Sequence, residues 1–267
     1  MKLFEDHYLK AIEAAIKASG EIMRIYQTSF FKNFKSDGSP VTEADTASSQ
    51  IIEEILESTG IPIICEENTK SDYQIRKSWK EVWLIDPLDG TKEYIRRNGE
   101  FAVNIALVRD NEPVFGLIAS PVNRRVLIGG LGKGAYVVEF EKAMDQHSWT
   151  KLEPKPINSP IVLASSRTPY RGQEVELINH IQQFDEIDYV KKGSALKFFD
   201  LAEGLADVYP RFAPTMEWDI AAGQAILNEL GGVVVDAYTG KPLVYNKESL
   251  YNSHFIAKSK GYLTKLG

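Results

Sequence analysis

The chain has 267 residues, of which 43% are hydrophobic and 25% are charged, and its formal net charge is −6. These values are ordinary for a soluble globular protein built as one large domain or as two closely packed halves. The excess of acidic residues excludes a general nucleic-acid binder, because affinity for such a polymer depends on clustered lysine and arginine. A small anionic substrate stays compatible, since metal ions and a few local bases can bind it.

The predicted location is cytoplasmic. Cys65 is the only cysteine, so an intramolecular disulfide is impossible, and this is compatible with a reducing compartment. Residues 1–7 carry early acids and lack a continuous apolar core, so they do not have the pattern of a signal peptide. No apolar run approaches the length of a membrane span.

The first predicted elements are two helices followed by strands. Apolar side chains return to one face over residues 4–29, and the turn-forming segment 36–40 breaks this helix. A second helix is predicted to start near Thr42, which is followed three places later by Asp45, and to stop at Gly60. Apolar runs and turn signals then predict strands at 61–65, 82–85, 101–109, 113–120, 125–129 and 135–139.

The second part of the chain alternates strands and helices after a polar segment, 141–160, that contains three prolines. Strands are predicted at 161–164, 188–190, 206–209 and 233–235, and helices at 173–184, 194–204 and 218–230. Such alternation favours an α/β arrangement. We therefore predict a layered α/β protein with an N-terminal α+β half, 1–155, whose sheet is mainly antiparallel, and a C-terminal α/β half, 156–267.

Two aspartates follow the predicted strand 82–85 in the segment 86–91, DPLDGT. Pro87 restricts φ and Gly90 permits a tight reversal, so Asp86 and Asp89 can converge from one turn with a backbone carbonyl between them. Carboxylate and carbonyl oxygens are the ligands that Mg²⁺ prefers. The alternative interpretation is an ordinary turn in which both aspartates only cap backbone groups.

Further acids occupy comparable places. Glu66 and Glu67 directly follow a predicted strand, and Asp45 and Asp219 lie in the first turns of predicted helices. Each one alone is explained by surface charge or by helix capping. Together they exceed what capping requires, and if they converge, cations or raised pKa values must relieve their repulsion. No histidine neighbours these segments, so an all-oxygen site favours magnesium or manganese over zinc.

Two segments carry a family resemblance that spans residues 8 to 260 or so. Segment 86–91 matches the signature DPxDGT, and segment 218–223, WDIAAG, matches WDxAAG. The sequence thereby resembles the inositol monophosphatase-like, lithium-sensitive phosphatases. The resemblance implies an αβαβα sandwich of the inositol monophosphatase/fructose-1,6-bisphosphatase type, two or three Mg²⁺ ions, and inhibition by lithium.

Within that superfamily the chain is most similar to bacterial 3'(2'),5'-bisphosphate nucleotidases of the CysQ type, in segments 193–197, 209–211 and 214–219. This likeness implies hydrolysis of the 3'-phosphate of adenosine 3',5'-bisphosphate, with 3'-phosphoadenosine 5'-phosphosulfate as a second candidate substrate, in support of sulfate assimilation. The alternatives are an inositol or sugar-phosphate phosphatase with the same metal core and a non-catalytic sensor of phosphate metabolites. The resemblance leaves open a monomer or a homodimer, and peripheral association with the cytoplasmic face of the inner membrane.

The resemblance also implies roles for individual residues. The implied metal ligands are Glu66, Asp86, the Leu88 carbonyl, Asp89 and Asp219, with Glu67 beside them or on a third ion. Thr91, oriented by Asp45, would position the attacking water. The implied substrate contacts are Gly90, Thr91, Ser194, Lys197, Arg211 and Asp219.

Two of these assignments and one further segment keep an alternative interpretation. Lys197 can lie on a solvated helix face, and Arg211 can form a surface ion pair. The segment 165–167 either contacts the nucleotide or forms an ordinary polar loop.

Overall fold

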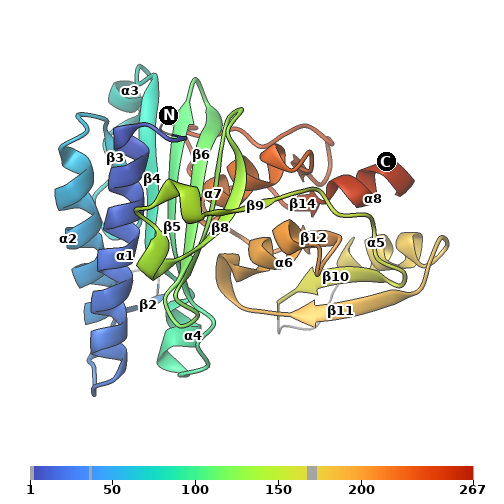
Figure 1. The fold of residues 1–267 in the computed structure, drawn as a ribbon, viewed down its shortest axis with the longest axis horizontal. Helices are drawn as coiled ribbons and strands as arrows, with labels where there is room; N and C mark the ends of the chain where they lie inside the picture. Colours follow the sequence, from blue (N-terminus) through green and yellow to red (C-terminus); the bar gives the residue numbers. More distant parts are fainter. Residues whose placement is uncertain (1–2, 36–37, 167–172, 267) are drawn as a thin grey trace.

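The computed structural model describes residues 3–35, 38–166 and 173–266, and these form five layers (Figure 1). Two sheets alternate with three layers of helices. The helices are, from the first layer to the last, α1 (Asp6–Tyr26) with α2 (Glu43–Glu57), α6 (Lys197–Glu203) with α7 (Glu217–Glu229), and α5 (Gln173–Ile181) with α8 (Lys260–Leu266). This αβαβα order confirms the predicted fold class.

The first sheet contains seven strands of the described chain in sequence order. They are β3 (Ile63–Cys65), β4 (Glu81–Asp89), β5 (Ala102–Arg109), β6 (Glu112–Ser120), β7 (Arg125–Gly130), β8 (Gly134–Glu139) and β9 (Thr150–Leu152). Only the pair β3 and β4 is parallel among them, which confirms the prediction of a mainly antiparallel sheet. Because β3 and β4 run in the same direction, their carboxyl ends meet at one edge.

The second sheet has the order β11-β10-β12-β14-β13. Its strands are β10 (Ile161–Ser165), β11 (Ile187–Lys191), β12 (Val208–Arg211), β13 (Val233–Asp236) and β14 (Phe255–Lys258). Strand β10 pairs in parallel with β11 and β12, as the alternation predicts, whereas β14 runs antiparallel to both of its neighbours. Strand β14 was not predicted from the sequence.

The N-terminal end of α2 is built from local hydrogen bonds. The Thr42 side chain accepts from the Ala44 amide, and Asp45 accepts from the Thr42 amide at 2.7 Å. Such a reciprocal cap satisfies amides that have no partner inside the helix. The segment before it forms a hairpin of β1 (Lys32–Phe34) and β2 (Pro40–Thr42) rather than only a break, and residues 36 and 37 lie outside the described residues.

The polar segment 141–160 contains regular structure. Besides the short 3₁₀ helices Phe140–Lys142 and Gln146–Ser148, it contains β9, which pairs with β8 and extends the first sheet. The division into halves at residue 155 stays a prediction. None of the helices in the described part of the chain combines the length and the apolar character that a bilayer crossing requires.

Helix α7 packs unusually close to the first sheet because glycines face it. A Cβ atom at Gly116 of β6 would lie 2.1 Å from the Ala222 carbonyl oxygen, and one at Gly129 of β7 would lie 2.7 Å from the Ile226 Cα. Neither distance is compatible with a side chain, so glycine is required for this approach. The close packing brings the first turn of α7 to the edge where β3 and β4 end.

Candidate functional site

The segment 86–91 departs from the predicted geometry at one point. Strand β4 does not stop at Asp86; it continues to Asp89 through a register shift in its pairing with β5, where Asp86 faces Asn104 and Asp89 faces Ala102. An irregularity of this kind redirects side chains without ending the strand. Gly90 then turns the chain with φ at 94°, the reversal that the sequence predicts. Both aspartates therefore leave the same strand end.

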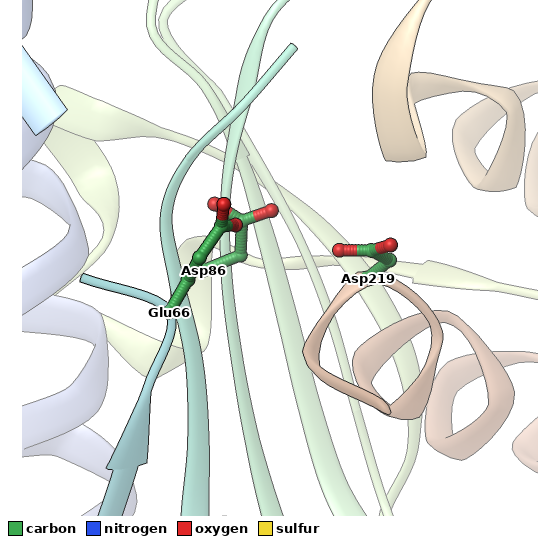
Figure 2. Close-up of side chains that lie close together, drawn as sticks. All are labelled: Glu66, Asp86 and Asp219. Carbon is green, nitrogen blue, oxygen red and sulfur yellow. The ribbon is translucent and has the colours of Figure 1, made fainter. Parts of the chain in front are cut away.

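Three carboxylates meet beyond this strand end. One oxygen each from Glu66, Asp86 and Asp219 lies within 4.8 Å of the others. Glu66 directly follows β3, Asp86 belongs to the neighbouring β4, and Asp219 faces them from the first turn of α7 (Figure 2). The structure thus brings together acids that are up to 153 positions apart in the chain, from 66 to 219.

Burial and mutual repulsion disfavour the ionised forms of the three aspartates at this site. Burial, followed by the charges of Glu66, Asp89 and Asp219, raises the pKa of Asp86 well above its usual range. Burial and the Asp89 charge do the same to the pKa of Asp219. Burial also raises the pKa of Asp89, although the Lys197 ammonium opposes the shift. A bound cation would remove the repulsion and let the carboxylates ionise.

Glu67 lies beside the cluster and not among its three converging carboxylates. The Lys35 ammonium lies 2.7 Å from a carboxylate oxygen of Glu67 and 2.7 Å from one of Glu66. The other Glu66 oxygen accepts a hydrogen bond from the Trp218 indole at 3.1 Å. Lys35 was not predicted, because a lysine in a short hairpin carries no sequence signal for a partner 31 residues away.

Asp45 and Thr91 form a hydrogen-bonded pair next to the cluster. The Thr91 hydroxyl donates to one Asp45 carboxylate oxygen at 2.9 Å and lies 3.3 Å from the Leu88 carbonyl. The second Asp45 oxygen accepts from the amide and the hydroxyl of Thr42, at 2.7 and 2.6 Å. The capping box of α2 therefore fixes the carboxylate that orients Thr91.

Asn104 is a polar residue of the site that the sequence analysis missed. Its side-chain nitrogen donates to Asp89 at 3.3 Å, and the Ala195 amide donates to the same carboxylate oxygen. Its carbonyl oxygen is buried and has no hydrogen-bond partner among the described residues. A buried oxygen without a donor next to three carboxylates fits a site that binds a hydrated cation.

A cavity of about 360 Å³ opens beside the carboxylates. Five of the six predicted substrate residues line it, namely Gly90, Ser194, Lys197, Arg211 and Asp219, whereas Thr91 is not among the lining residues. Two cations at its rim, Lys92 and Arg96, were not predicted. Both follow the DPLDGT segment in the sequence. Their spacing of four residues is the one sequence feature that indicates a common helix face. That helix is α4 (Thr91–Ile95), with Arg96 at its end.

Lys197 and Arg211 supply positive charge to the cavity wall. Lys197 is 3% exposed, so the alternative of a solvated helix face is wrong. Its ammonium donates to the carbonyls of Ser194 at 2.6 Å and Lys192 at 3.1 Å, and burial lowers its pKa to about 8. The Arg211 Nε atom is buried and has no hydrogen-bond partner within the described chain. A guanidinium N–H without an acceptor, in a cavity wall, fits an anionic ligand group.

The segment 165–167 reaches the cavity in part. Ser166 lines it, and the buried hydroxyl of Ser165 has no hydrogen-bond partner in the described residues. Arg167 lies outside the described residues. Ser194 lines the cavity from a backbone conformation with φ at 52°, at the start of the 3₁₀ helix Ser194–Leu196.

Comparisons with known proteins find similar sequences over almost the whole chain. The model of the inositol monophosphatase family matches residues 5–265. A 3'(2'),5'-bisphosphate nucleotidase CysQ of Salmonella typhimurium is 39% identical over 249 residues, which cover 91% of this chain and 96% of the relative.

Solved structures show the same fold. The crystal structure of CysQ from Bacteroides thetaiotaomicron, a bacterial member of the inositol monophosphatase family, is 38% identical, with a TM-score of 0.85, covering 96% of this chain and 98% of the other. An IMPase/NADP phosphatase crystallised with Mg²⁺ and phosphate is 16% identical with a TM-score of 0.73, over 92% of this chain and 87% of the other.

Proposed function

Because the chain belongs to the inositol monophosphatase family, we propose that it is a magnesium-dependent 3'(2'),5'-bisphosphate nucleotidase that converts adenosine 3',5'-bisphosphate to AMP and phosphate. The observation that carries the proposal is the carboxylate cluster of Glu66, Asp86 and Asp219 beside a cavity whose wall contains Lys197 and Arg211. Action on 3'-phosphoadenosine 5'-phosphosulfate and support of sulfate assimilation are parts of the same proposal.

The donor set fits magnesium. All candidate ligands are oxygens: the carboxylates of Glu66, Asp86, Asp89 and Asp219 and the carbonyl of Leu88. Hard divalent cations prefer such ligands, and the three converging carboxylates need a cation when ionised. Bound magnesium would supply Lewis acidity to the phosphoryl group and to the attacking water. Two ions held by these ligands, with a third near Glu67, remain our prediction.

The protein's own side chains would orient the attacking water and accept its proton. Thr91 already donates its hydroxyl hydrogen to Asp45, so its oxygen lone pairs are free to accept a hydrogen bond from water. Asp45 is held from its other oxygen by Thr42, which keeps the Thr91 hydroxyl in one orientation. Thr91 would thereby orient the attacking water, and Asp45 would receive the proton that Thr91 passes on.

The second phosphate of the substrate needs cations that are separate from the reaction centre. Arg211 offers a buried N–H without a partner in the described structure, and Lys197 keeps one hydrogen of its ammonium after donating two to carbonyls. An inositol monophosphate has one phosphate on an uncharged ring, so it has no second phosphate for Arg211 and Lys197. These groups would stay unsatisfied, which costs binding energy. The cavity therefore favours a bisphosphate over an inositol phosphate.

A direct assay tests the activity. The purified chain with Mg²⁺ is incubated with adenosine 3',5'-bisphosphate or inositol 1-phosphate, and phosphate release is measured. We expect kcat/KM to be at least about 100-fold higher for the nucleotide, because the site contains groups made to bind its second phosphate. Equal or faster hydrolysis of inositol 1-phosphate would support a cyclitol phosphatase. No metal-dependent release from any phosphate ester would support a sensor.

The Arg211→Ala variant tests the second-phosphate contact. We expect kcat/KM for adenosine 3',5'-bisphosphate to fall about 10- to 100-fold, the usual loss for a charge-assisted hydrogen bond in a cavity. Adenosine 3'-monophosphate lacks the 5'-phosphate, so its hydrolysis should fall by no more than about threefold. Equal losses on both nucleotides would remove Arg211 from this role.

The remaining expectations stay predictions of the family likeness. They are inhibition by lithium, a cytoplasmic location with peripheral membrane association left open, and a monomeric or homodimeric state.

A further inference from the structure

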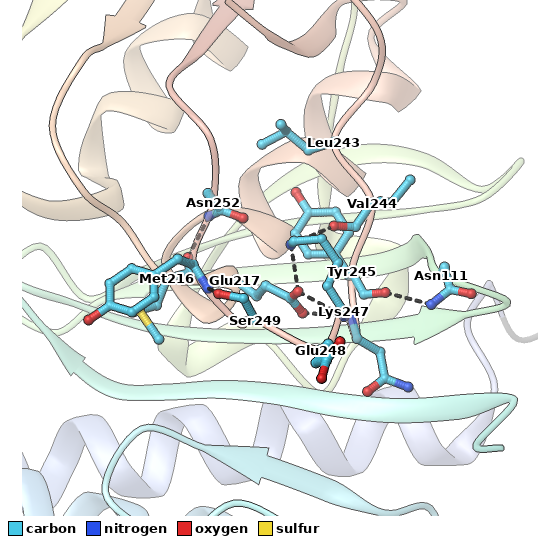
Figure 3. A network of polar contacts seen from close by, with 12 residues as sticks. Asn111, Met216, Glu217, Leu243, Val244, Tyr245, Lys247, Glu248, Ser249 and Asn252 are labelled. Carbon is cyan, nitrogen blue, oxygen red and sulfur yellow. Dashed lines mark hydrogen bonds and ion pairs between the residues drawn. The ribbon is translucent and has the colours of Figure 1, made fainter. Parts of the chain in front are cut away.

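The first turn of α7 carries a second carboxylate, two residues before Asp219, that the proposed reaction does not use. Glu217 is fully buried. Its Oε2 atom accepts a hydrogen bond from the Asn246 amide at 2.6 Å, and its Oε1 atom accepts from the Lys247 amide at 3.1 Å. The Lys247 ammonium lies 2.6 Å from Oε1 (Figure 3). Glu217 thus binds the backbone of a segment about 30 residues further along the chain.

That segment, residues 243–252, is here named the strap. It is attached to α7 and to the residues before it along its length (Figure 3). The Gln224 side chain donates to the Leu243 carbonyl at 3.2 Å, the Glu217 amide to the Leu250 carbonyl at 2.9 Å, and the Asn252 side chain to the Met216 carbonyl at 2.6 Å. These hydrogen bonds couple the position of the first turn of α7 to that of the strap.

The strap is also bound to the part of the chain that carries Glu66. Arg76, in α3 (Tyr73–Arg76), donates to the Asn246 side chain at 3.0 Å and to the Lys247 carbonyl at 2.6 Å. The Asn246 side chain donates back to the Arg76 carbonyl at 2.8 Å. At the turn between β5 and β6, the Asn111 side chain donates to the Tyr245 carbonyl at 2.6 Å. The strap therefore joins Arg76 of α3, which follows Glu66 by ten residues in the chain, to Glu217, which precedes Asp219 by two.

We infer that Glu217 is a positioning residue that fixes the separation of Asp219 from Glu66 and Asp86, and so sets the affinity of the site for magnesium. The inference rests on the proposed function, since it assumes a metal ion at these carboxylates. Without the Glu217 carboxylate the amides of Asn246 and Lys247 lose their acceptor, and the first turn of α7 keeps only its backbone hydrogen bond to the strap, from the amide of residue 217 to the Leu250 carbonyl. A shift of about 1 Å at Asp219 is enough to weaken coordination.

The Glu217→Ala variant tests this inference in the full-length protein. Isothermal titration with MgCl₂ alone should show a dissociation constant raised about 10-fold or more, the usual effect of losing a residue that supports a metal ligand. Turnover should recover toward the wild-type kcat at saturating Mg²⁺, with KM for adenosine 3',5'-bisphosphate changed by no more than about twofold.

The chain offers a matched control on the same helix. Glu229, at the far end of α7, accepts hydrogen bonds from the amides of Gly132 at 3.1 Å and Gly134 at 2.7 Å. Glu229→Ala therefore also removes a glutamate that anchors α7 to backbone amides, but away from the carboxylate cluster. It should lower the unfolding temperature and leave the magnesium dissociation constant unchanged.

Three results would contradict either the inference about Glu217 or the proposed function. An unchanged magnesium dissociation constant in Glu217→Ala, with a loss of unfolding temperature like that of Glu229→Ala, would reduce Glu217 to a structural anchor. If Glu217→Ala does not fold, Glu217→Gln keeps the size and one acceptor oxygen, and it should raise the constant at least about threefold; no change overturns the inference. A wild-type protein that binds Mg²⁺ but releases no phosphate from the nucleotide contradicts the proposed function alone.

Discussion

Replacing Asp86 by asparagine is expected to reduce turnover of adenosine 3',5'-bisphosphate by about 10³-fold or more, with the fold retained. Asp86 is buried, one of its oxygens lies within 4.8 Å of oxygens of Glu66 and Asp219, and its Oδ1 atom accepts a hydrogen bond from the Leu88 amide at 3.0 Å. Asparagine keeps that acceptor and the side-chain shape but removes the charge that magnesium requires. Steady-state kinetics at saturating Mg²⁺ measure the loss, and near-normal activity would contradict the metal assignment.

The same variant should be more stable than the wild-type protein when metal is absent. Burial and neighbouring acids raise the pKa of Asp86, so the folded state resists its ionisation. The neutral side chain removes this conflict, and we expect a gain of about 0.5–2 kcal/mol in the free energy of unfolding with EDTA present.

The pH dependence gives a sharper check of that gain. A carboxyl whose pKa is raised by folding contributes stability below its unfolded pKa, and this is lost as pH rises through its folded pKa. The advantage of Asp86→Asn should therefore be larger at pH 8 than at pH 4, and addition of Mg²⁺ should stabilise only the wild-type protein appreciably. If Asp86→Asn were less stable than the wild-type protein at pH 8 without metal, ionised Asp86 would not destabilise the metal-free fold.

Replacing Gly116 by alanine is expected to destabilise the fold by about 2–4 kcal/mol. The new methyl group would lie 2.1 Å from the Ala222 carbonyl oxygen, so α7 must move away from the first sheet. The displacement also moves Asp219, so the folded fraction should bind magnesium more weakly. Equilibrium unfolding in urea measures the first effect and isothermal titration the second.

Gly20 supplies the control for this substitution. It lies within α1, and a Cβ atom at this position would meet no atom of another segment within 4 Å, so Gly20→Ala adds the same methyl group without a clash. Alanine in a helix interior should stabilise the protein by about 0.5–1 kcal/mol. If Gly116→Ala stayed within about 0.5 kcal/mol of the wild-type protein, the close approach of α7 would not be a constraint.

The carboxylates can be predicted from the sequence because their signals are local. Asp86 and Asp89 follow an apolar run, Glu66 follows another, and Asp219 opens a helix, so each acid could be assigned to the end of an element. The same reasoning placed the end of β4 too early, because the register shift between Asp86 and Asp89 depends on the pairing with β5. Pairing geometry is a property of two strands and cannot be read from one.

Partners that come from distant segments were missed. Lys35 contacts Glu66 and Glu67 from a hairpin, Asn104 contacts Asp89 from the neighbouring strand, and Arg76 contacts Asn246 across 170 positions. A lysine or asparagine has no periodic pattern that announces such a partner. These contacts depend on which surfaces the packed core brings together.

By itself the sequence determined the layered α/β class, the family motifs, and the acids that end strands and begin helices, because these follow from periodicity and turn chemistry over a few residues. Only the tertiary structure decided that three of these acids meet within 4.8 Å, and that a buried glutamate and a strap hold one of them in place. The physical reason is that glycines of the first sheet let α7 approach it closely. This packing joins segments that are about 100 residues apart in the chain, so it cannot be read from a local pattern.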